Sequence, residues 1–280
     1  MTAFRRLGPA GSERPVVEID GTVFDLTPLT ADIDGAFLAA DGLARATQEA
    51  RAGRLPVVDP TGLRVGPPIA RPQAILCIGQ NYAAHAAESG SPVPEQPILF
   101  LKHPNTLVGP DDDVVLPRGS SRGDWEVELA VVIGTRAADC DSDDEALGHV
   151  AGYAVANDVS EREYQFDLSG GQWSTGKTFP TFCPVGPDLV PADEVEPQAL
   201  RLRSWVNGEP RQDSSTKDMV FDVATLIRVL SQRLVLEPSD LVLTGTPEGV
   251  ALSGRFAYLV RGDVVEMEID GLGRQRQQVR

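Results

Sequence analysis

The stretch Asp124-Trp125-Glu126-Val127-Glu128-Leu129-Ala130-Val131-Val132-Ile133-Gly134 contains a short apolar, β-branched run, which is typical of a buried strand. Successive side chains of a strand point to opposite faces, so Glu126 and Glu128 share one face, with Cα atoms roughly 7 Å apart. Two ionised carboxylates on a buried strand repel each other and lose hydration, so a compensating cation is expected. Arginine or lysine could supply it, but a hard divalent ion fits better if a third carboxylate converges.

A candidate third carboxylate is Asp158, at the C-terminal end of the apolar segment 152–157. Taken alone, the paired glutamates also fit a solvated strand face, and Asp158 also fits a helix N-cap or a turn. Both acidic positions, however, adjoin strands that are too apolar for the surface. The sequence therefore predicts a three-carboxylate site for Mg²⁺ or Mn²⁺ at Glu126, Glu128 and Asp158, with Ca²⁺ as an ion that can replace them in crystals.

Composition places the chain among ordinary globular proteins, with 41% hydrophobic and 24% charged residues in 280. The formal net charge of −16 argues against nucleic acid or an anionic membrane as a partner. The N-terminus lacks a hydrophobic signal core and no run reaches membrane-spanning length, which favours a cytoplasmic protein. The three cysteines are odd in number and widely spaced, so neither disulfides nor a zinc site is expected.

The order of the expected elements predicts two domains. A tight hairpin over residues 16–26 and a helix over 31–51 precede the proline-rich stretch 57–72, which is typical of a linker. We therefore expect a domain boundary near Arg71, with a small N-terminal domain over residues 1–70 and a larger domain over 71–280.

His85 and Glu88 follow the predicted strand 74–79, in an alanine-rich turn of helix. Residues three apart share one helix face, so the two side chains can form a hydrogen bond. A histidine oriented by a carboxylate is a plausible general base for water, although a surface ion pair has the same spacing. The following Ser91-Pro92-Val93-Pro94 is consistent with a hinged lid.

Two further segments carry polar groups suited to an anionic ligand. Lys177 lies among aromatic residues and prolines, where it could pair with a substrate oxyanion or, alternatively, form a salt bridge to a nearby acid. The turn around Thr244, Gly245 and Thr246 offers hydroxyl groups and free amides to a carboxylate.

Several motifs, taken together, resemble the fumarylacetoacetate hydrolase family. They occur in the family's order from about residue 74 to the C-terminus, and their collinearity is far more specific than any one of them. The motifs are Gly79-Gln80-Asn81-Tyr82 through His85 and Glu88, Trp125-Glu126-Val127-Glu128-Leu129, Asn157-Asp158-Val159-Ser160-Glu161-Arg162, Gly176-Lys177-Thr178-Phe179, Val206-Asn207-Gly208-Glu209, Leu243-Thr244-Gly245-Thr246-Pro247 and Gly262-Asp263-Val264-Val265-Glu266.

The resemblance implies a β-rich α+β fold, with a mixed β-roll or sandwich core and a small N-terminal α+β domain. It further implies a homodimer, and Mg²⁺ or Mn²⁺ on the three carboxylates. It also implies that His85 and Glu88 activate water and that Lys177 stabilises an oxyanion. The residues that it places around the substrate are Tyr82, Arg162, Gln165, Gly245 and Thr246. One departure stands after Lys177, where many members have aspartate at the position of Pro180.

The resulting hypothesis is a hydrolase that cleaves the C–C bond of a 2,4-diketo acid, an acylpyruvate, to pyruvate and a carboxylic acid. Gly123-Asp124-Trp125, Gln165-Phe166 and Gly170-Gly171-Gln172-Trp173 are most similar to the bacterial subgroup that acts on 2,4-diketo-3-deoxy sugar acids. Decarboxylation of oxaloacetate and isomerisation or hydration of a 2-hydroxy-diene-dioate use the same metal platform and remain alternatives. A non-catalytic module with a structural ion is the least favoured interpretation.

Overall fold

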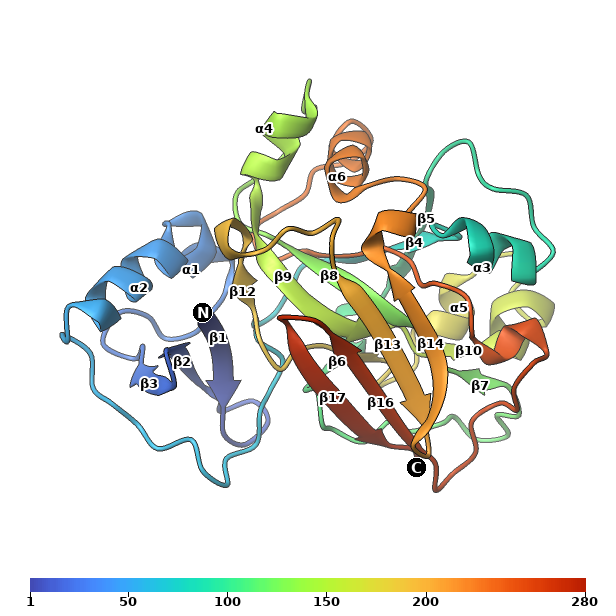
Figure 1. Ribbon diagram of the computed structural model, residues 1–280, viewed down its shortest axis with the longest axis horizontal. Coiled ribbons are helices and arrows are strands. Elements are labelled where there is room, and N and C mark those ends of the chain that lie inside the picture. The colour runs from blue at the N-terminus through green and yellow to red at the C-terminus, as the bar shows by residue number, and fades with distance from the viewer.

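The computed structural model describes residues 1–280 and is built from five sheets with short helices around them (Figure 1). The N-terminal elements lie at the left of the view, and the elements α3, α5, β7 and β10 lie at the right. Strand content exceeds helix content and the two types of element intermix, so the predicted α+β, β-rich class is confirmed.

The N-terminal part consists of one antiparallel sheet and two helices. The sheet contains β1 (Thr2–Leu7), β2 (Arg14–Ile19) and β3 (Thr22–Asp25), and the expected hairpin turns at Asp20 and Gly21, both with positive φ. The single helix expected over 31–51 is instead two helices, α1 (Gly35–Ala39) and α2 (Gly42–Arg51). The break falls at Asp41, whose backbone is left-handed at φ 55° and so cannot continue a right-handed helix.

The central sheet has six strands in the order β12-β9-β8-β15-β4-β5 and is mixed, because only β15 and β4 are parallel. Apolar residues alternate along β8, and the two faces of the sheet bury them in different cores. The strands are β4 (Ile75–Gly79), β5 (Ile98–Lys102), β8 (Val127–Ile133), β9 (Val150–Asn157), β12 (Val190–Pro191) and β15 (Leu241–Leu243).

The second large sheet has four antiparallel strands in the order β14-β13-β16-β17. They are β13 (Arg201–Val206), β14 (Glu209–Ser215), β16 (Val264–Ile269) and β17 (Gly273–Gln278), and the β13–β14 hairpin turns at Asn207 and Gly208, as expected. Side chains such as Leu202 and Met267 share one core with Val127, Leu129 and Val131 of β8. The two sheets thus form the predicted sandwich.

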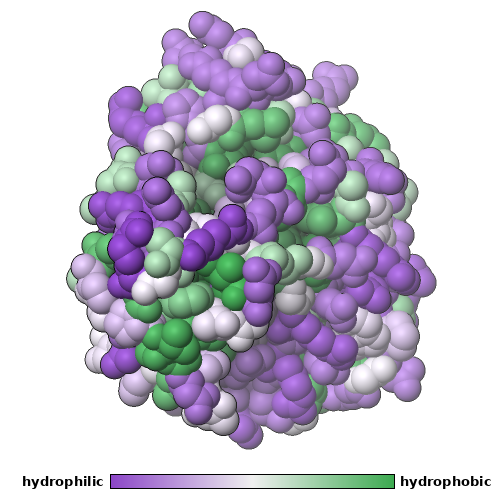
Figure 2. Space-filling view, turned by 60° about the vertical axis from the view of Figure 1, so that its left-hand side comes forward, coloured by the Kyte–Doolittle hydropathy of each residue, from purple (hydrophilic) through white to green (hydrophobic).

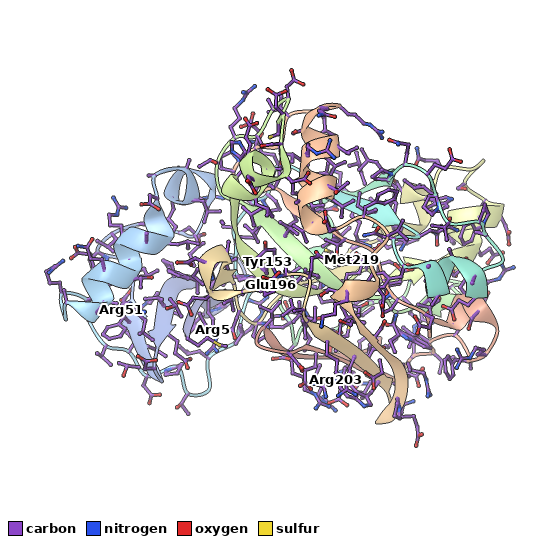
Figure 3. The ribbon with its side chains drawn as sticks, turned by 45° about the horizontal axis from the view of Figure 1, so that its top comes forward. Arg5, Arg51, Tyr153, Glu196, Arg203 and Met219 are labelled. Atoms are coloured by element: carbon purple, nitrogen blue, oxygen red, sulfur yellow. The ribbon has the colours of Figure 1, made fainter.

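The other face of the six-stranded sheet is covered by the N-terminal part. Ala130 and Val132 of β8 pack in one core with Phe4 and Phe37. Strand β1 is also joined to the segment before β12, because Phe4 and Leu189 exchange two backbone hydrogen bonds. Arg5, which Figure 3 labels where the N-terminal sheet meets the rest of the chain, pairs with Asp188 beside that junction.

The remaining elements are short and mostly surround the sheets. Helices α4 (Asp143–Gly148) and α6 (Val223–Ser231) pack together at the top of Figure 1. The others are α3 (Ala83–Glu88), α5 (Ser174–Lys177), the π-helix η2 (Glu163–Asp167), the 3₁₀ turns η1 (Pro104–Thr106), η3 (Ala192–Glu194), η4 (Thr216–Asp218) and η5 (Ala251–Ser253), and the strands β6 (Leu107–Val108), β7 (Gly123–Asp124), β10 (Ser160–Glu161) and β11 (Cys183–Pro184). None of the helices has both the length and the apolarity needed to span a bilayer.

Candidate active site

The register of two neighbouring strands brings the three predicted metal ligands together. Val127 of β8 pairs with Asn157 of β9, and the Asp158 amide donates to the Glu126 carbonyl oxygen over 3.0 Å. Glu126, immediately before β8, and Glu128, within it, lie on the same side of the extended chain because they are two residues apart. One carboxylate oxygen from each of Glu126, Glu128 and Asp158 lies within 4.8 Å of the others, and all three side chains are buried.

Two buried lysines hold two of these carboxylates. Lys177, at the end of α5, donates from Nζ to Glu126 Oε2 (2.6 Å) and Asp158 Oδ2 (2.8 Å). Lys102, the last residue of β5, donates from Nζ to Asp158 Oδ1 and to the Val159 carbonyl oxygen. Lys177 therefore does form the salt bridges that the sequence left open, and it forms them to the proposed metal ligands.

The two glutamates of β8 have different electrostatic surroundings. Burial alone would raise the pKa of Glu126, but the charges of Lys177 and Arg162, with a smaller contribution from His85, lower it to about 2. Burial and the neighbouring charges of Asp158 and Glu126 raise the pKa of Glu128 well above its usual range. The one hydrogen bond to the Glu128 carboxylate is the Gly245 amide, at 2.9 Å. Glu128 is thus the acid in the cluster without a cationic partner.

Arg162 connects the cluster to the segment before β8. Its guanidinium donates to Asp124 Oδ2 (2.9 Å from Nε), Glu126 Oε1 (2.7 Å from Nη2) and Gln165 Oε1 (2.9 Å from Nη1). The Asp124 carboxylate also accepts the amides of Ala251 and Leu252, which fixes that loop against the site. Most of the guanidinium donors are therefore engaged by protein groups, so Arg162 positions Glu126 and Gln165.

His85 and Glu88 form the pair that their spacing predicts. His85 Nδ1 lies 3.0 Å from Glu88 Oε1, and the Gly249 amide donates to the Glu88 carboxylate oxygens over 3.0 and 3.1 Å. His85 is only 6% exposed, so the pair is not a surface ion pair. With Nδ1 donating to the carboxylate, Nε2 is left as the basic nitrogen.

The other predicted substrate-binding residues differ in where they lie. Gln165 and Thr246 line the same cavity, but the Thr246 hydroxyl donates to the Val127 carbonyl oxygen (2.9 Å) and accepts from Gln212 Nε2 (2.7 Å). Gly245 has φ 94°, a left-handed conformation that favours glycine and directs its amide to Glu128. Tyr82 is fully buried with an unpartnered hydroxyl and is not among the residues that line the cavity.

The carboxylate cluster opens into a cavity of about 310 Å³. Charged and polar residues line one part of it, and aromatic side chains line another. The lining residues are Ile78, Gly79, Gln80, His85, Glu88, Ser89, Ser91, Phe100, Glu126, Glu128, Arg162, Gln165, Phe166, Trp173, Lys177, Thr246 and Leu252. The cavity therefore places His85 and Glu88 in the same space as the acidic cluster.

Sequence reasoning did not assign roles to Lys102, Asp124, Gln212, Gln80 or Trp173. A lysine that ends an apolar strand is the one signal that would have pointed to Lys102. Trp173 packs against Gly79, where an added Cβ would lie 2.4 Å from the Trp173 ring, so only glycine permits this approach. Such a contact between distant segments has no local sequence signature.

The donor set fits a hard divalent cation. Three buried carboxylates offer only oxygen ligands, as Mg²⁺ and Mn²⁺ prefer, and one of them lacks a positive partner. Glu126, Glu128 and Asp158 would hold the ion. Neutralisation of Glu128 is the energetic gain that such an ion would bring.

A larger cavity of about 1030 Å³ lies between α2 and the strands β9 and β12 and contains none of the predicted site residues. The face turned forward in Figure 2 is mostly hydrophilic, with hydrophobic residues gathered around a hollow in its upper half. Volume alone does not define a site, and the smaller cavity has the convergent charged groups.

A β-sandwich that presents three buried carboxylates beside a histidine–glutamate pair combines, around one cavity, an acidic cluster that could bind a divalent ion and a candidate general base. The family model for the fumarylacetoacetate (FAA) hydrolase C-terminal domain matches residues 74–280, so the chain belongs to the fumarylacetoacetate hydrolase family. It is a hydrolase or an isomerase of that family.

Relatives are similar over the whole chain. One from Burkholderia multivorans, whose name proposes a hydrolase and no substrate, is 46% identical over 98% of both chains. The structure of maleylpyruvate hydrolase from Sphingobium sp. SYK-6, in complex with manganese(II) and pyruvate, is 30% identical with a TM-score of 0.81 and covers 99% of this chain and 98% of its own. The 2-hydroxyhepta-2,4-diene-1,7-dioate isomerase from Mycobacterium marinum is 31% identical with a TM-score of 0.76, over 100% and 98%.

Proposed function

We propose that the protein is a metal-dependent hydrolase that cleaves the C–C bond of a 2,4-diketo acid to pyruvate and a carboxylic acid. The observation that carries this proposal is the His85–Glu88 pair, which lines the same cavity as Glu126 and Glu128 of the carboxylate cluster. The similar maleylpyruvate hydrolase, crystallised with manganese(II) and pyruvate, supports the same chemistry. The proposal includes Mg²⁺ or Mn²⁺ at Glu126, Glu128 and Asp158, and a homodimer in solution.

The bound ion would supply Lewis acidity toward the carboxylate and 2-oxo oxygens of the substrate. His85 Nε2 takes a proton from water while Glu88 holds the ring, and the water oxygen attacks the distal carbonyl carbon, C4. The C3–C4 bond then breaks to release the carboxylic acid, and the proton on His85 passes to C3, which gives pyruvate. Because Gln165 Oε1 accepts from Arg162, its Nε2 group is free to donate to the developing oxyanion. Lys177 uses two of its three N–H donors on carboxylates, which leaves one for the substrate.

The test is turnover of a panel of 2,4-diketo acids by the wild type and by His85→Ala, with Mn²⁺ and with EDTA. We expect the wild type to release pyruvate only with the metal, and His85→Ala to lose at least about 100-fold in kcat, because general-base catalysis contributes about 10²–10⁴-fold. His103→Ala is the matched control, since His103 is an exposed histidine outside the cavity.

Isomerisation of a 2-hydroxy-diene-dioate is the second candidate, favoured by the similar isomerase from Mycobacterium marinum. An isomerase has no need to activate water. Full activity of His85→Ala on every substrate that turns over would therefore reject the hydrolase and favour the isomerase. Absence of turnover on the whole panel, with ion bound, would reject the proposed substrate class.

A further inference from the structure

The charge distribution of the cavity points to a substrate with a single carboxylate and an uncharged tail. We propose that Gln80, Ser89, Ser91, Phe166 and Trp173, here called the tail subsite, bind that neutral tail. The inference rests on the proposed function, because it names the part of a 2-oxo acid substrate that lies away from the carboxylate cluster.

All cationic residues of the cavity lie at its acidic end. Its lining contains one arginine, Arg162, and one lysine, Lys177, and both donate hydrogen bonds to carboxylates of the cluster. His85 is held by Glu88. The tail subsite itself contains only neutral residues, and Glu88, immediately before Ser89, adds a negative charge to the lining near it. A second carboxylate there would have no positive partner and would lose hydration.

A charge balance at the acidic end gives the same result. Four buried carboxylates, three in the cluster and Asp124, face three cations, Lys102, Arg162 and Lys177. Glu88, beside neutral His85, adds a fifth carboxylate, so the site carries two net negative charges, which a divalent ion would bring to zero. One substrate carboxylate, held by that ion, already makes the loaded site negative. A second carboxylate would add a further uncompensated negative charge to the enclosed cavity.

The tail subsite is built for neutral polar and apolar contact. Trp173 is fixed edge-on between Phe100 and Phe166, with ring centroids 5.8 and 5.9 Å away. The side chains of Gln80 and Ser91 are partly buried and donate no hydrogen bond within the protein, whereas Ser89 donates to the Ala86 carbonyl oxygen. An aromatic wall beside a free amide and a free hydroxyl suits a tail with hydroxyl or carbonyl groups.

The test compares 2-oxoglutarate with its 5-(N,N-dimethylcarboxamide), which has no amide N–H and so cannot close to a lactam, by calorimetric titration into the full-length, Mn²⁺-loaded protein. We expect the carboxamide to bind at least tenfold more tightly. In Ser91→Lys this preference should fall at least tenfold or reverse, whereas the uncharged Ser91→Met should retain it. Equal or tighter binding of the dicarboxylate by the wild type would overturn the inference, and so would an unchanged preference in folded Ser91→Lys.

Hydrolysis is measured separately, on a 2,4-diketo acid pair with carboxamide and carboxylate tails. If the C–C bond of the carboxamide-tailed substrate is cleaved with a kcat/KM at least tenfold greater than that of the carboxylate-tailed substrate, both the inference and the proposed function are supported. Absence of cleavage together with selective binding of the carboxamide rejects the hydrolase and supports the neutral tail subsite. Faster C–C cleavage of the carboxylate-tailed substrate supports the hydrolase and rejects the neutral tail subsite.

Discussion

Replacing Glu128 with glutamine removes one buried negative charge and preserves the shape of the side chain. In the metal-free protein Glu128 has one hydrogen bond, from the Gly245 amide, and no cation. Glu126, by contrast, pairs with Arg162 and Lys177 over 2.7 and 2.6 Å. We therefore expect Glu128→Gln to raise the free energy of unfolding of EDTA-treated protein at pH 8 by about 1–4 kcal/mol, the range for relieving an unfavourable buried charge.

The pH dependence follows from the raised pKa of Glu128, which has burial as its largest cause and the charges of Asp158 and Glu126 as further causes. In the unfolded chain a glutamate ionises near pH ~4.3, so the unfolded state releases this proton at a lower pH than the folded state does. Stability of the metal-free wild type thus falls as the pH rises above that value. The advantage of Glu128→Gln should grow between pH 5 and pH 8 as measured by urea unfolding.

Glu126→Gln is the matched control, because the same substitution there removes one of the two carboxylate partners of both Arg162, which keeps Asp124, and Lys177, which keeps Asp158. It should destabilise the metal-free protein by about 3–5 kcal/mol, the usual cost of breaking a buried ion pair. Adding Mn²⁺ at about 100 times its dissociation constant should stabilise the wild type by about 2.7 kcal/mol and Glu128→Gln by less. A loss of stability in Glu128→Gln equal to that in Glu126→Gln would contradict this account of the site.

Two further substitutions examine residues to which the sequence analysis gave no role. Lys102→Met removes the ammonium from Asp158 and should lower the free energy of unfolding by about 3–5 kcal/mol in EDTA; a urea midpoint equal to that of the wild type would contradict a structural role for this pair. Gly79→Ala places a Cβ 2.4 Å from the Trp173 ring, so the ring must move. We expect KM to rise several-fold while Mn²⁺ affinity, measured by calorimetry, stays unchanged; an equal loss of Mn²⁺ affinity would place the effect at the carboxylates instead.

The alternation of residues along β8 could be predicted because it is local. A strand has a period of two, so the printed order of residues already separates Glu126 and Glu128 from the apolar residues of the opposite face. The fold class followed from motifs in family order and is confirmed. The prediction of one helix over residues 31–51 was wrong, because apolar spacing gives no sign of the left-handed backbone at Asp41 that divides it into α1 and α2.

The partners of the acidic cluster could not be predicted in the same way. Lys102 ends β5 and Asp158 follows β9, two strands that are not neighbours in the sheet, yet their side chains are paired. The Asp124 carboxylate accepts hydrogen bonds from the amides of Ala251 and Leu252, in a loop far along the chain. These contacts depend on tertiary arrangement, whereas single-sequence patterns report only local periodicity. The roles assigned to His85, Lys177 and the substrate-binding residues remain predictions that the experiments above address.

The core shared by β8 and the N-terminal part has a practical consequence for anyone who shortens the protein. The family match begins at residue 74, yet Ala130 and Val132 are shielded from water by Phe4, Phe37 and their neighbours. A polypeptide that started at residue 74 would expose these apolar residues to solvent, on the same face of β8 as Glu128. We expect such a fragment to aggregate and to lack activity, because the N-terminal part covers the apolar face of the six-stranded sheet next to the candidate active site.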